Sequence, residues 1–539
     1  MNLIEDEWIP VRRRSGGVAR IAPWQLTDGF AEDPFVELAA PRPDFNGALV
    51  QFLIGLLQTC FAPEDAHEWR QRFHHAPTSG ELKKAFVPVA AHFDLDGDGP
   101  RFLQDITLAQ EIEGFKPDAQ ERQISPVGDM LIEVPTGKTL KDNTDLFVKR
   151  GRITALCSAC AATALFTLQT NAPLGGRGHL TGIRGGGPLT TLVLADSLWA
   201  TAWLNVLERG VFLRRTGNPA RNAPVDQFPW LGRTRTRDAD PSTTPEDAHP
   251  TQVFWAMPRR IRLIFSNRQS ECELCGAADS GVVRQYQTKT NGVNYAGPWR
   301  HPLSPYFVKQ DGTPNAIHPR PGGIGYRHWL GLVQGIDDVK AKRQPAAVVE
   351  GYLGTGSVDL RLWVFGYDMK EKKARCWHDA IMPLLVCPPE IREDFAFRAK
   401  ALVKAAELAA YETRAQLKKA LFKRGGDAKG GLSFITGRYW QETEPGFYAL
   451  LRRVRKALGD RADVTATLED WHKTLVDTAR RIFDDVSQTG AFDAADPKRI
   501  ALAWRDLQKA VRGRKMRQIL GLPDKLSQKA RVGKRTEGR

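Results

Sequence analysis

The spacing of four cysteines is the sequence feature that most constrains this chain. Cys157 and Cys160 form one C-x-x-C pair, and Cys272 and Cys275 form a second pair with the same spacing. Each pair can offer two thiolates to one ion, and two pairs complete the tetrahedral four-sulfur site typical of structural zinc. Such a site leaves no coordination position open, so the pattern predicts a structural metal, assembled by the fold across a long insert.

Two other interpretations of the pairs remain open: two unrelated knuckles, or a redox-active dithiol. The other three cysteines, Cys60, Cys376 and Cys387, are interpreted as small buried apolar side chains. The expected compartment is the cytoplasm, where C-x-x-C pairs bind metal more often than they form disulfides. That expectation rests on an acidic start, Met1–Glu7, and on the lack of an apolar window of about 18 residues, which also argues against a membrane partner.

Length and charge narrow the classes of function. The chain has 539 residues, enough for at least two domains, and its 42% of hydrophobic residues is typical of a globular protein. Its 77 basic and 62 acidic residues leave a net charge of +15. This charge favours a polyanionic partner, with a basic surface that has no partner as the alternative.

The N-terminal part, residues 1–375, predicts one large mixed α/β domain. Leu49–Leu57 is mostly apolar and predicts a buried helix, whereas Arg262–Phe265 and Leu360–Phe365 predict strands. Arg214–Pro250 is rich in Arg, Pro, Asp and Thr, which predicts a long exposed loop.

The C-terminal part changes to long amphipathic segments. Apolar side chains step by three and four in four successive segments, which predicts an antiparallel four-helix bundle over residues 390–520. The fold class expected for the whole chain is therefore α+β. Residues 521–539 are basic with little apolar content and predict a disordered tail.

The last of the four helical segments is strongly basic. Ile500, Trp504 and Leu507 predict its apolar face, and Asp506 is its single acid. We expect the segment to pack this face in the bundle and to turn its charge toward a nucleic-acid backbone. Its eight cations are Lys498, Arg499, Arg505, Lys509, Arg512, Arg514, Lys515 and Arg517.

No motif in the sequence predicts a catalytic centre. Gly137–Thr139 lacks the first glycine of a P-loop, because Ile132 stands at that position. His67 begins like a zinc-protease helix, but the second histidine is missing. The acidic run Asp94–Asp105 lacks the final Glu of a calcium loop and is interpreted as a solvated turn.

Three segments instead predict contact with nucleic acid. Pro173–Pro188 is rich in glycine and carries Arg177 and Arg184, so its backbone could approach phosphates or a groove; a tight structural turn is the alternative. Asp145–Gly151 places an aromatic ring beside two cations, as suits stacking on a base. Gly366–Arg375 predicts a hairpin tip with four cations, either a groove insert or a solvated turn.

Together these features resemble a known family, the CasA large subunit of the type I-E CRISPR Cascade complex. The likeness runs over nearly the whole chain and includes the glycine-rich loop and both cysteine pairs. It also includes Met1–Val11, Phe147–Gly151 and Gly366–Met369. The resemblance implies a large α/β N-terminal domain followed by a four-helix bundle, in agreement with the periodicity.

The resemblance also implies a non-catalytic function. Such subunits assemble with the other Cascade subunits and the guide RNA (crRNA), and they recognise the protospacer-adjacent motif (PAM) in double-stranded target DNA from the minor groove. They help to open the duplex and recruit a helicase-nuclease. The minor groove carries a degenerate code, so PAM choice can be permissive while guide pairing supplies specificity. Two other functions remain open: a zinc-stapled nucleic-acid-processing enzyme, and a basic scaffold subunit that binds DNA independently of a PAM.

Three elements of the family carry its DNA recognition: a glycine loop, a lysine finger and a glutamine wedge. The glycine loop corresponds by position to Leu174, Gly175, Gly176, Arg177 and Gly178, in which Leu174 and Arg177 interrupt the glycine run. The lysine finger corresponds to Lys289, although direct spacing points to Thr290.

The wedge corresponds to the predicted hairpin tip, where this chain has no glutamine. Lys372 and Lys373 align best with the wedge residues, and Lys370 is an alternative. The family's loop that meets the 5′ handle of the guide RNA corresponds to Phe147, Val148 and Lys149.

Overall fold

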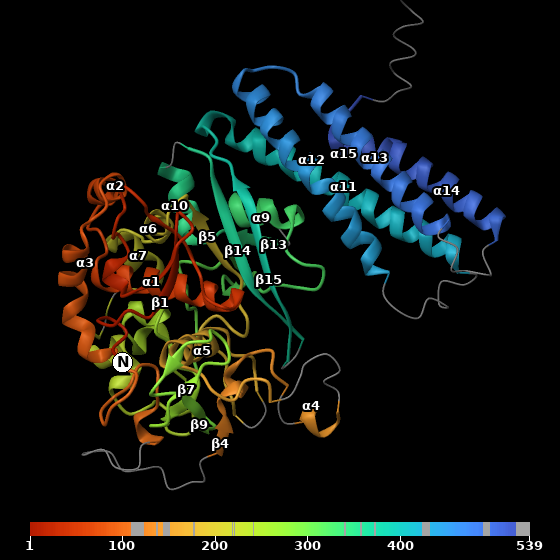
Figure 1. Cartoon of the computed structure of the whole chain (residues 1–539). Helices are drawn as coiled ribbons and strands as arrows, with labels where there is room; N and C mark the ends of the chain where they lie inside the picture. The colour runs from red at the N-terminus through yellow and green to blue at the C-terminus, as the bar shows by residue number, and fades with distance from the viewer. Residues whose placement is uncertain are drawn as a thin grey trace, which may run out of the picture. The chain divides into compact units, whose positions relative to one another are not determined.

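The structure is a computed structural model of the whole chain (Figure 1). It describes residues 1–108, 123–135, 138–143, 151–175, 178–217, 219, 221–240, 242–338, 341–355, 358–370, 373–422, 432–488 and 496–523. The chain divides into two compact units. The first comprises residues 1–321, 336–355 and 360–381, and the second comprises residues 322–335, 356–359 and 382–539.

The first unit is built on small antiparallel sheets. One sheet has the order β2-β1-β3 (Val18–Ile21, Ile9–Arg13, Phe35–Leu38), and another β4-β9-β6 (Gln123–Pro126, Val283–Lys289, Arg260–Phe265). A third has the order β15-β14-β5 (Lys373–Leu384, Leu360–Lys370, Thr190–Leu194), and a fourth β11-β10-β13-β12 (Pro314–Ala316, Tyr306–Val308, Ala341–Gln344, Ile336–Asp338). The two-stranded β7-β8 sheet is formed by Ser270–Glu271 and Ala278–Asp279.

The helices of the first unit are mostly short. They are α1 (Pro43–Cys60), α2 (Ala66–His74), α3 (Ser79–Phe86), α4 (Lys138–Lys141), α5 (Ser158–Asn171), α6 (Leu198–Leu204), α7 (Arg209–Thr216), α8 (Pro224–Gln227) and α10 (Ala347–Thr355). The strands predicted from Arg262–Phe265 and Leu360–Phe365 are confirmed as parts of β6 and β14. The buried helix predicted over Leu49–Leu57 is confirmed as part of α1, which is buried on nearly every side.

An aromatic cluster explains why α1 is so deeply buried. Phe52 of α1 makes edge-to-face contacts with the rings of Trp8, Phe93 and Trp255, at centroid distances of 5.4, 6.1 and 5.7 Å. Such pairs add about 0.5–1.5 kcal/mol each beyond the area that they bury. Phe228 and Trp230 pack against Trp255 in the same cluster, and both are at most 1% exposed. The prediction of a wholly exposed loop over Arg214–Pro250 is therefore wrong at these rings.

A buried ion pair anchors the edge of the β4-β9-β6 sheet. Arg260 at the start of β6 donates from Nε to Asp105 Oδ2 at 2.6 Å, and both side chains are at most 3% exposed. A buried charge needs such a partner, because it is costly to remove from water alone. The acidic run therefore divides: Asp96 and Asp98 are exposed, as expected of a solvated turn, but Asp105 belongs to the core.

The second unit contains the predicted helices. They are α9 (Trp329–Val333), α11 (Arg392–Leu421), α12 (Ser433–Gly459), α13 (Thr465–Gln488), α14 (Pro497–Arg512) and α15 (Arg514–Leu520). Helix α11 contacts α12, α13 and α14, and α13 contacts both α12 and α14. The α+β fold class with a helical C-terminal region is confirmed, and in the described residues no helix is both long and apolar enough to cross a membrane.

Residues 322–335 also pack into the helical unit, which the sequence did not predict. The ring of Tyr326 stacks on Phe447 of α12 at 4.3 Å, and its hydroxyl contacts Thr443 Oγ1 at 2.8 Å. Trp329 packs edge-to-face on Phe395 of α11. These contacts explain why a segment that precedes β14 in sequence belongs to the second unit.

The last predicted helix is interrupted. Gly513 has an extended backbone (φ −74°, ψ 172°) and separates α14 from α15. The apolar stripe of α14 runs through Leu507 and Val511, both fully buried, whereas Trp504 is 36% exposed. Trp504 was expected within the packed face and instead lies at its margin.

Substitution of Trp471 should destabilise the helical unit strongly. Trp471 is fully buried, and its Nε1 donates to the carbonyl of Leu402 at 3.0 Å. Trp471→Ala removes a large core side chain and its hydrogen bond to that carbonyl, so we expect a loss of about 3–5 kcal/mol. Urea unfolding followed by helical circular dichroism measures the change, and Trp504→Ala is the matched control, expected to cost about 1 kcal/mol or less. Equal costs for the two variants would contradict this packing.

Candidate metal centre and nucleic-acid surface

The two C-x-x-C pairs come together as one cluster, which we call the cysteine cluster: Cys157, Cys160, Cys272 and Cys275. The four sulfur atoms all lie within 4.8 Å of one another, and Cys157 Sγ is 3.6 Å from Cys275 Sγ. Cys157, Cys160 and Cys272 are buried, and Cys275 is half-buried. The interpretation as two unrelated knuckles is therefore wrong.

Each pair is shaped by its local backbone. Cys157 is the N-cap of α5, and its sulfur accepts the backbone N–H of Cys160 at 3.4 Å. In the second pair, the N–H of Gly276 donates to the carbonyl of Cys272 at 2.8 Å, with Gly276 in the left-handed region (φ +73°). This tight turn joins β7 to β8 and turns the second pair of sulfurs toward the first.

Two carboxylates clamp the pairs together from outside the cluster. Glu273 accepts hydrogen bonds from the backbone N–H groups of Thr154 and Ala155. Asp279 accepts from the N–H and the hydroxyl of Ser158 at 2.8 and 3.0 Å. The start of α5 and the β7-β8 hairpin are therefore joined by side chains as well as by sulfur, and these contacts hold the pKa of Glu273 below its ordinary value.

The electrostatics of the cluster favour a bound cation. Hydrogen bonding to Cys157 raises the pKa of the Cys160 thiol, while hydrogen bonds from Cys157 and Cys160 lower the pKa of Cys275 to about 6. Arg20 Nη2 also donates to Cys275 Sγ at 3.6 Å, which favours a thiolate there. Four thiols this close cannot all ionise unless a cation lies between them.

The cluster fits zinc by its donor set and its spacing. A tetrahedral ion with Zn–S bonds of about 2.3 Å separates its sulfurs by roughly 3.8 Å, close to the 3.6 Å between Cys157 and Cys275. All four protein ligands are sulfur, so zinc bound here would have no position left for a substrate. A metal held by this cluster would therefore be structural.

The described parts of the glycine loop are residues 173–175, which come soon after the end of α5, and Gly178, which contacts the segment that follows β9. The N–H of Asn291 donates to the carbonyl of Gly178 at 3.0 Å. Gly178 has φ +79°, and a Cβ there would lie 2.2 Å from Asn291 Oδ1, so glycine is required at this contact. Gly175 also donates its N–H to the carbonyl of His179 at 2.9 Å, and Gly176 and Arg177 lie outside the described residues.

A third loop joins this contact, which the sequence analysis did not identify. The backbone N–H of Arg237 donates to the carbonyls of Asn291 and Gly292, and the Asn291 amide donates to Asp238 at 2.9 Å. Arg233 and Arg237 are exposed on this loop. The available signals were the Asn-Gly pair, a typical turn, and the arginine content of the loop.

Two cations expected at the nucleic-acid surface are buried instead. Lys289 is 9% exposed, because it ends β9 in register with Arg260 of β6 and its side chain enters the unit. Arg184 is 6% exposed and donates to Gln51 Oε1 at 2.6 Å and to Thr190 and Ser304 at 3.0 Å. Neither residue projects as the sequence analysis expected.

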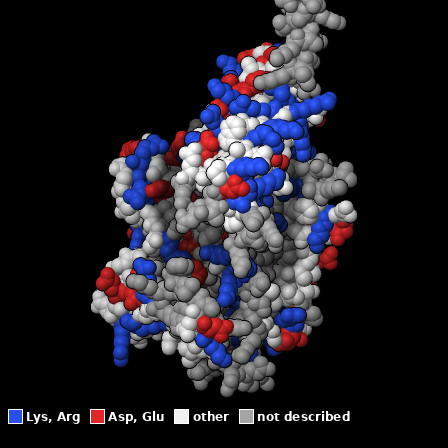
Figure 2. Space-filling model, turned by 90° about the vertical axis from the view of Figure 1, so that its right-hand side faces the viewer, with Lys and Arg blue, Asp and Glu red and all other residues white. Residues whose placement is uncertain are grey.

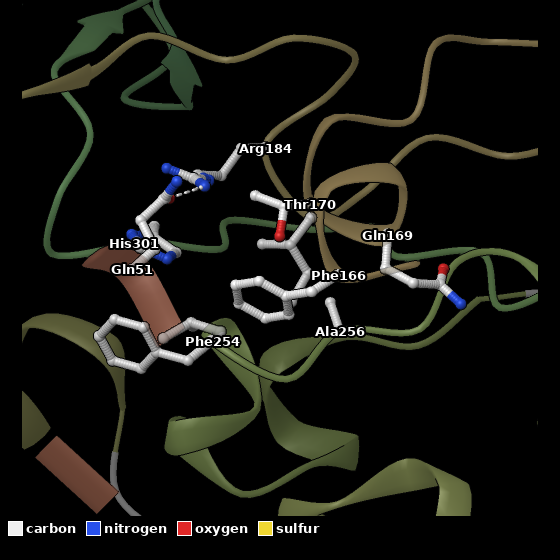
Figure 3. A pocket seen from close by; sticks show the side chains of 10 residues that line it. Gln51, Phe166, Gln169, Thr170, Arg184, Phe254, Ala256 and His301 are labelled. Carbon is white, nitrogen blue, oxygen red and sulfur yellow. Dashed lines mark hydrogen bonds between the residues drawn. The ribbon is translucent and has the colours of Figure 1, made fainter. Parts of the chain in front are cut away.

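Arg184 lies beside a small cavity in the first unit (Figure 3). The cavity has room for about one water molecule, about 20 Å³, and is lined by Gln51, Phe166, Phe254 and His301 among others. Burial lowers the pKa of Arg184 to about 10 and that of His301 well below its ordinary value. The cavity is too small for a nucleotide and adds no candidate for catalysis.

The strands on either side of the predicted hairpin tip, β14 and β15, are neighbours in one sheet. Lys370 and Lys373 are exposed at the ends of the strands, and Lys372 lies outside the described residues. The hairpin is held on the first unit close to the glycine-rich segment: a Cβ on Gly187 (φ +62°) would lie 2.7 Å from the carbonyl oxygen of Tyr367. Phe147, Val148 and Lys149 also lie outside the described residues.

The basic C-terminal helix keeps most of its cations at the surface. Figure 2 shows Lys and Arg gathered over the helical unit, with some acids among them. Of the eight cations expected there, six are exposed, on α14 and α15: Lys498, Arg505, Lys509, Arg512, Arg514 and Lys515. Arg499 is half-buried, and Arg517 is 3% exposed because it is paired with Glu469 of α13 at 2.6 Å. The expectation was therefore wrong for Arg517.

Comparison with known proteins gives a consistent result. Residues 2–482 match the family model described as CRISPR-associated protein Cse1. The fold is similar to the crystal structure of CasA from Thermus thermophilus (TM-score 0.68, 17% identity, covering 97% of this chain and 99% of that one). It is also similar to Thermobifida fusca Cse1 (TM-score 0.69, 15% identity, 97% and 99%) and to a chain of a CRISPR RNA-guided surveillance complex (TM-score 0.65, 16% identity, 95% and 99%).

Loss of the metal should destabilise the first unit. We expect the chain, purified in a mild chelator, to retain about one zinc, because four buried thiolates bind this ion tightly. Cys272→Ser should lose that zinc and lower the thermal midpoint of the first unit. Cys60→Ser, outside the cluster, should keep the zinc and the wild-type midpoint. Elemental analysis and thermal unfolding measure these results, and a metal-free wild-type chain that is fully folded would refute the assignment.

Proposed function

The chain belongs to the CRISPR-associated protein Cse1 family, and on that premise we propose that it is the large subunit of a type I-E Cascade complex. In this proposal it is a non-catalytic protein that recognises the PAM in double-stranded DNA, promotes strand opening and recruits a helicase-nuclease. Its partners would be the other Cascade subunits, the crRNA and the target DNA. Zinc in the cysteine cluster would be its structural metal.

One observation carries the proposal beyond the family: the contact between Gly178 and Asn291. It fixes the glycine loop against the segment after β9, two stretches that lie far apart in the sequence. Leu174, next to Gly175, is 48% exposed, so this loop belongs to the surface. A glycine backbone can approach base edges in the minor groove where a Cβ would collide.

The cation beside the glycine loop would not come from Lys289. Its burial argues against a projecting lysine finger. Arg237 is the better candidate, because it is exposed and its backbone N–H donates a hydrogen bond to the carbonyl of Asn291. An arginine side chain can enter a narrow minor groove without reading a particular base.

The lysine hairpin tip would act where the duplex begins to separate. Lys370 and Lys373 are exposed, and Lys372 lies between them in sequence. Cations at a wedge favour contact with phosphates of the parted strands, which can offset the few kcal/mol that unstacking a base step costs. We therefore expect the glycine loop to recognise the PAM and the lysine tip to help separate the two DNA strands.

Two other functions make different predictions. A zinc-stapled nuclease would cleave DNA when the pure chain is given Mg²⁺ or Mn²⁺, and we expect intact plasmid. Among the described residues, the groups that could hold a metal contain cysteine and not the carboxylate pairs of two-metal nucleases. A basic scaffold subunit would bind DNA equally with and without a PAM.

Removal of the tip cations should slow opening without abolishing recognition. In the assembled complex, replacing Lys370, Lys372 and Lys373 with Ala should leave initial PAM binding near wild type and slow strand opening on the order of tenfold, a change of about 1.4 kcal/mol. Fluorescence of a base analogue beside the PAM measures opening, and a target with a pre-opened bubble should restore the rate. The matched control replaces Arg70 and Lys84, exposed on α2 and α3. If the bubble gives no rescue, the tip does not act in opening.

Neutralising the basic helix should weaken binding equally for all sequences. Arg512, Arg514 and Lys515 are exposed, and removing a cation that contacts a phosphate should reduce the log–log salt slope by about 0.9. Their replacement by Gln should therefore lower the slope by up to about 2.7 without changing PAM preference. Binding assays across a salt series measure the slope, and the control removes three exposed cations from other helices, Lys404, Lys473 and Arg480. An unchanged slope would mean that this surface does not contact nucleic acid.

A further inference from the structure

Three potential metal ligands gather near the tip of the β14-β15 hairpin, outside the cysteine cluster. They are Asp368 of β14 and Cys376 and His378 of β15. Cys376 Sγ is 3.3 Å from His378 Nε2, and that nitrogen is 4.0 Å from Asp368 Oδ2. Among the described residues, this group and the cysteine cluster are the sets that could hold a metal ion.

Two of the three separations between the donor atoms are close to those that one zinc ion requires, and all three are within 4.8 Å. Tetrahedral bonds of about 2.3 Å to sulfur and about 2.0–2.2 Å to nitrogen and oxygen place sulfur roughly 3.6 Å from nitrogen, and nitrogen roughly 3.4 Å from oxygen. The observed 3.3 and 4.0 Å differ from these values by a few tenths of an ångström. Shifts of this size need only small side-chain rotations.

The strands already hold these side chains in place. Cys376 and His378 are two residues apart on one strand, so both point to the same face of the hairpin. Asp368 is 2% exposed, and Arg375 Nη2 donates to its Oδ1 at 2.5 Å, while its Oδ2 is the atom nearer His378. At metal sites a ligating carboxylate usually also accepts a hydrogen bond from an outer-shell group, as Asp368 does here from Arg375.

The same observation corrects the sequence analysis. Cys376 was expected to be a buried apolar side chain, but it is exposed. Its sulfur is therefore accessible to an ion from solvent. Cys387 is buried, as expected, and Cys60 is half-buried.

We propose that Asp368, Cys376 and His378 form a second zinc site, with water as the fourth ligand. A thiolate, an imidazole and a carboxylate together suit zinc or cobalt and do not suit magnesium or calcium. Binding would displace the proton of the Cys376 thiol to solvent and leave the sulfur as a ligand. The ion would join β14 to β15 behind the lysine tip and stiffen the hairpin.

This site should bind more weakly than the cysteine cluster. It has three protein ligands instead of four, and Arg375 and the exposed Lys370 and Lys373 repel a cation. We therefore expect a chelator to remove this ion first, and the chain to retain the zinc of the cysteine cluster. The inference does not depend on the proposed function.

Cobalt titration of the zinc-loaded full chain tests the proposal. Co²⁺ added to a chain that holds one zinc should bind with a stoichiometry of about one and give thiolate-to-cobalt and visible d–d absorption. Cys376→Ser should abolish the thiolate band, and Asp368→Asn and His378→Asn should weaken binding at least tenfold. Cys60→Ser and His67→Asn, outside the group, should titrate as wild type.

Alkylation locates the ion independently of these spectra. Zn²⁺ should slow the reaction of Cys376 with iodoacetamide at least tenfold in the wild-type chain and not in His378→Asn, with mass spectrometry identifying the modified residue. If no cobalt binds beyond the cysteine cluster, the proposal is wrong. It is equally wrong if His378→Asn and Asp368→Asn bind cobalt with the affinity of the wild-type chain, because Cys376 would then bind the ion without the other two ligands. Circular dichroism of each variant shows that a loss of binding is not a loss of fold.

Discussion

The contact between two distant C-x-x-C pairs is the constraint on which the proposed nucleic-acid surface depends. From the cysteine cluster, α5 leads from Ser158 to Asn171 and then into the glycine loop, while the other half of the cluster leads through β8 and β9 toward Asn291. The fourteen residues of α5 span about 21 Å and the seven residues of β9 about 23 Å, so these two elements are of nearly equal length. They meet again where Asn291 donates to Gly178. We therefore expect the cysteine cluster at one end to restrict how the two loops can meet at the other.

The surface formed in this way depends more on backbone than on side chains. Gly178 and Gly187 occupy left-handed conformations in which a Cβ would collide with Asn291 and Tyr367. The first contact joins Gly178 of the glycine loop to the segment after β9. The second joins Gly187, further along the glycine-rich stretch Pro173–Pro188, to Tyr367 of β14. Because backbone groups present the same donors and acceptors whatever the neighbouring side chains, such a surface suits a reader that tolerates several PAM sequences. In the proposed function, exposed cations at the ends of β14 and β15 would add attraction to phosphates that is independent of sequence.

The sequence predicted the features that depend on local pattern. The C-x-x-C spacing identified both pairs of the cysteine cluster, and apolar periodicity identified α11 to α14. Each of these signals lies within one short segment of the sequence. Most of the failures concern charged or aromatic side chains that are buried by distant partners. Lys289 is buried by its register with Arg260, Arg517 by its pairing with Glu469, Arg184 by Gln51, and Trp230 by the ring of Trp255. Each partner lies on a different element from the side chain that it buries, so only the complete fold brings the two into contact.

The most direct measurement is a binding selection with the assembled complex. Wild-type complex, loaded with one crRNA, is incubated with targets that share the protospacer and carry a randomised PAM, and bound and unbound DNA are separated on a gel and sequenced. If this chain reads the PAM through a backbone surface in the minor groove, bound DNA should be enriched in a small set of related PAM sequences. Replacing Gly178 with Asp, which places a charged side chain against Asn291, should remove that enrichment while non-specific binding persists. Equal binding of every PAM by the wild-type complex, or unchanged enrichment with Gly178→Asp, would contradict the account.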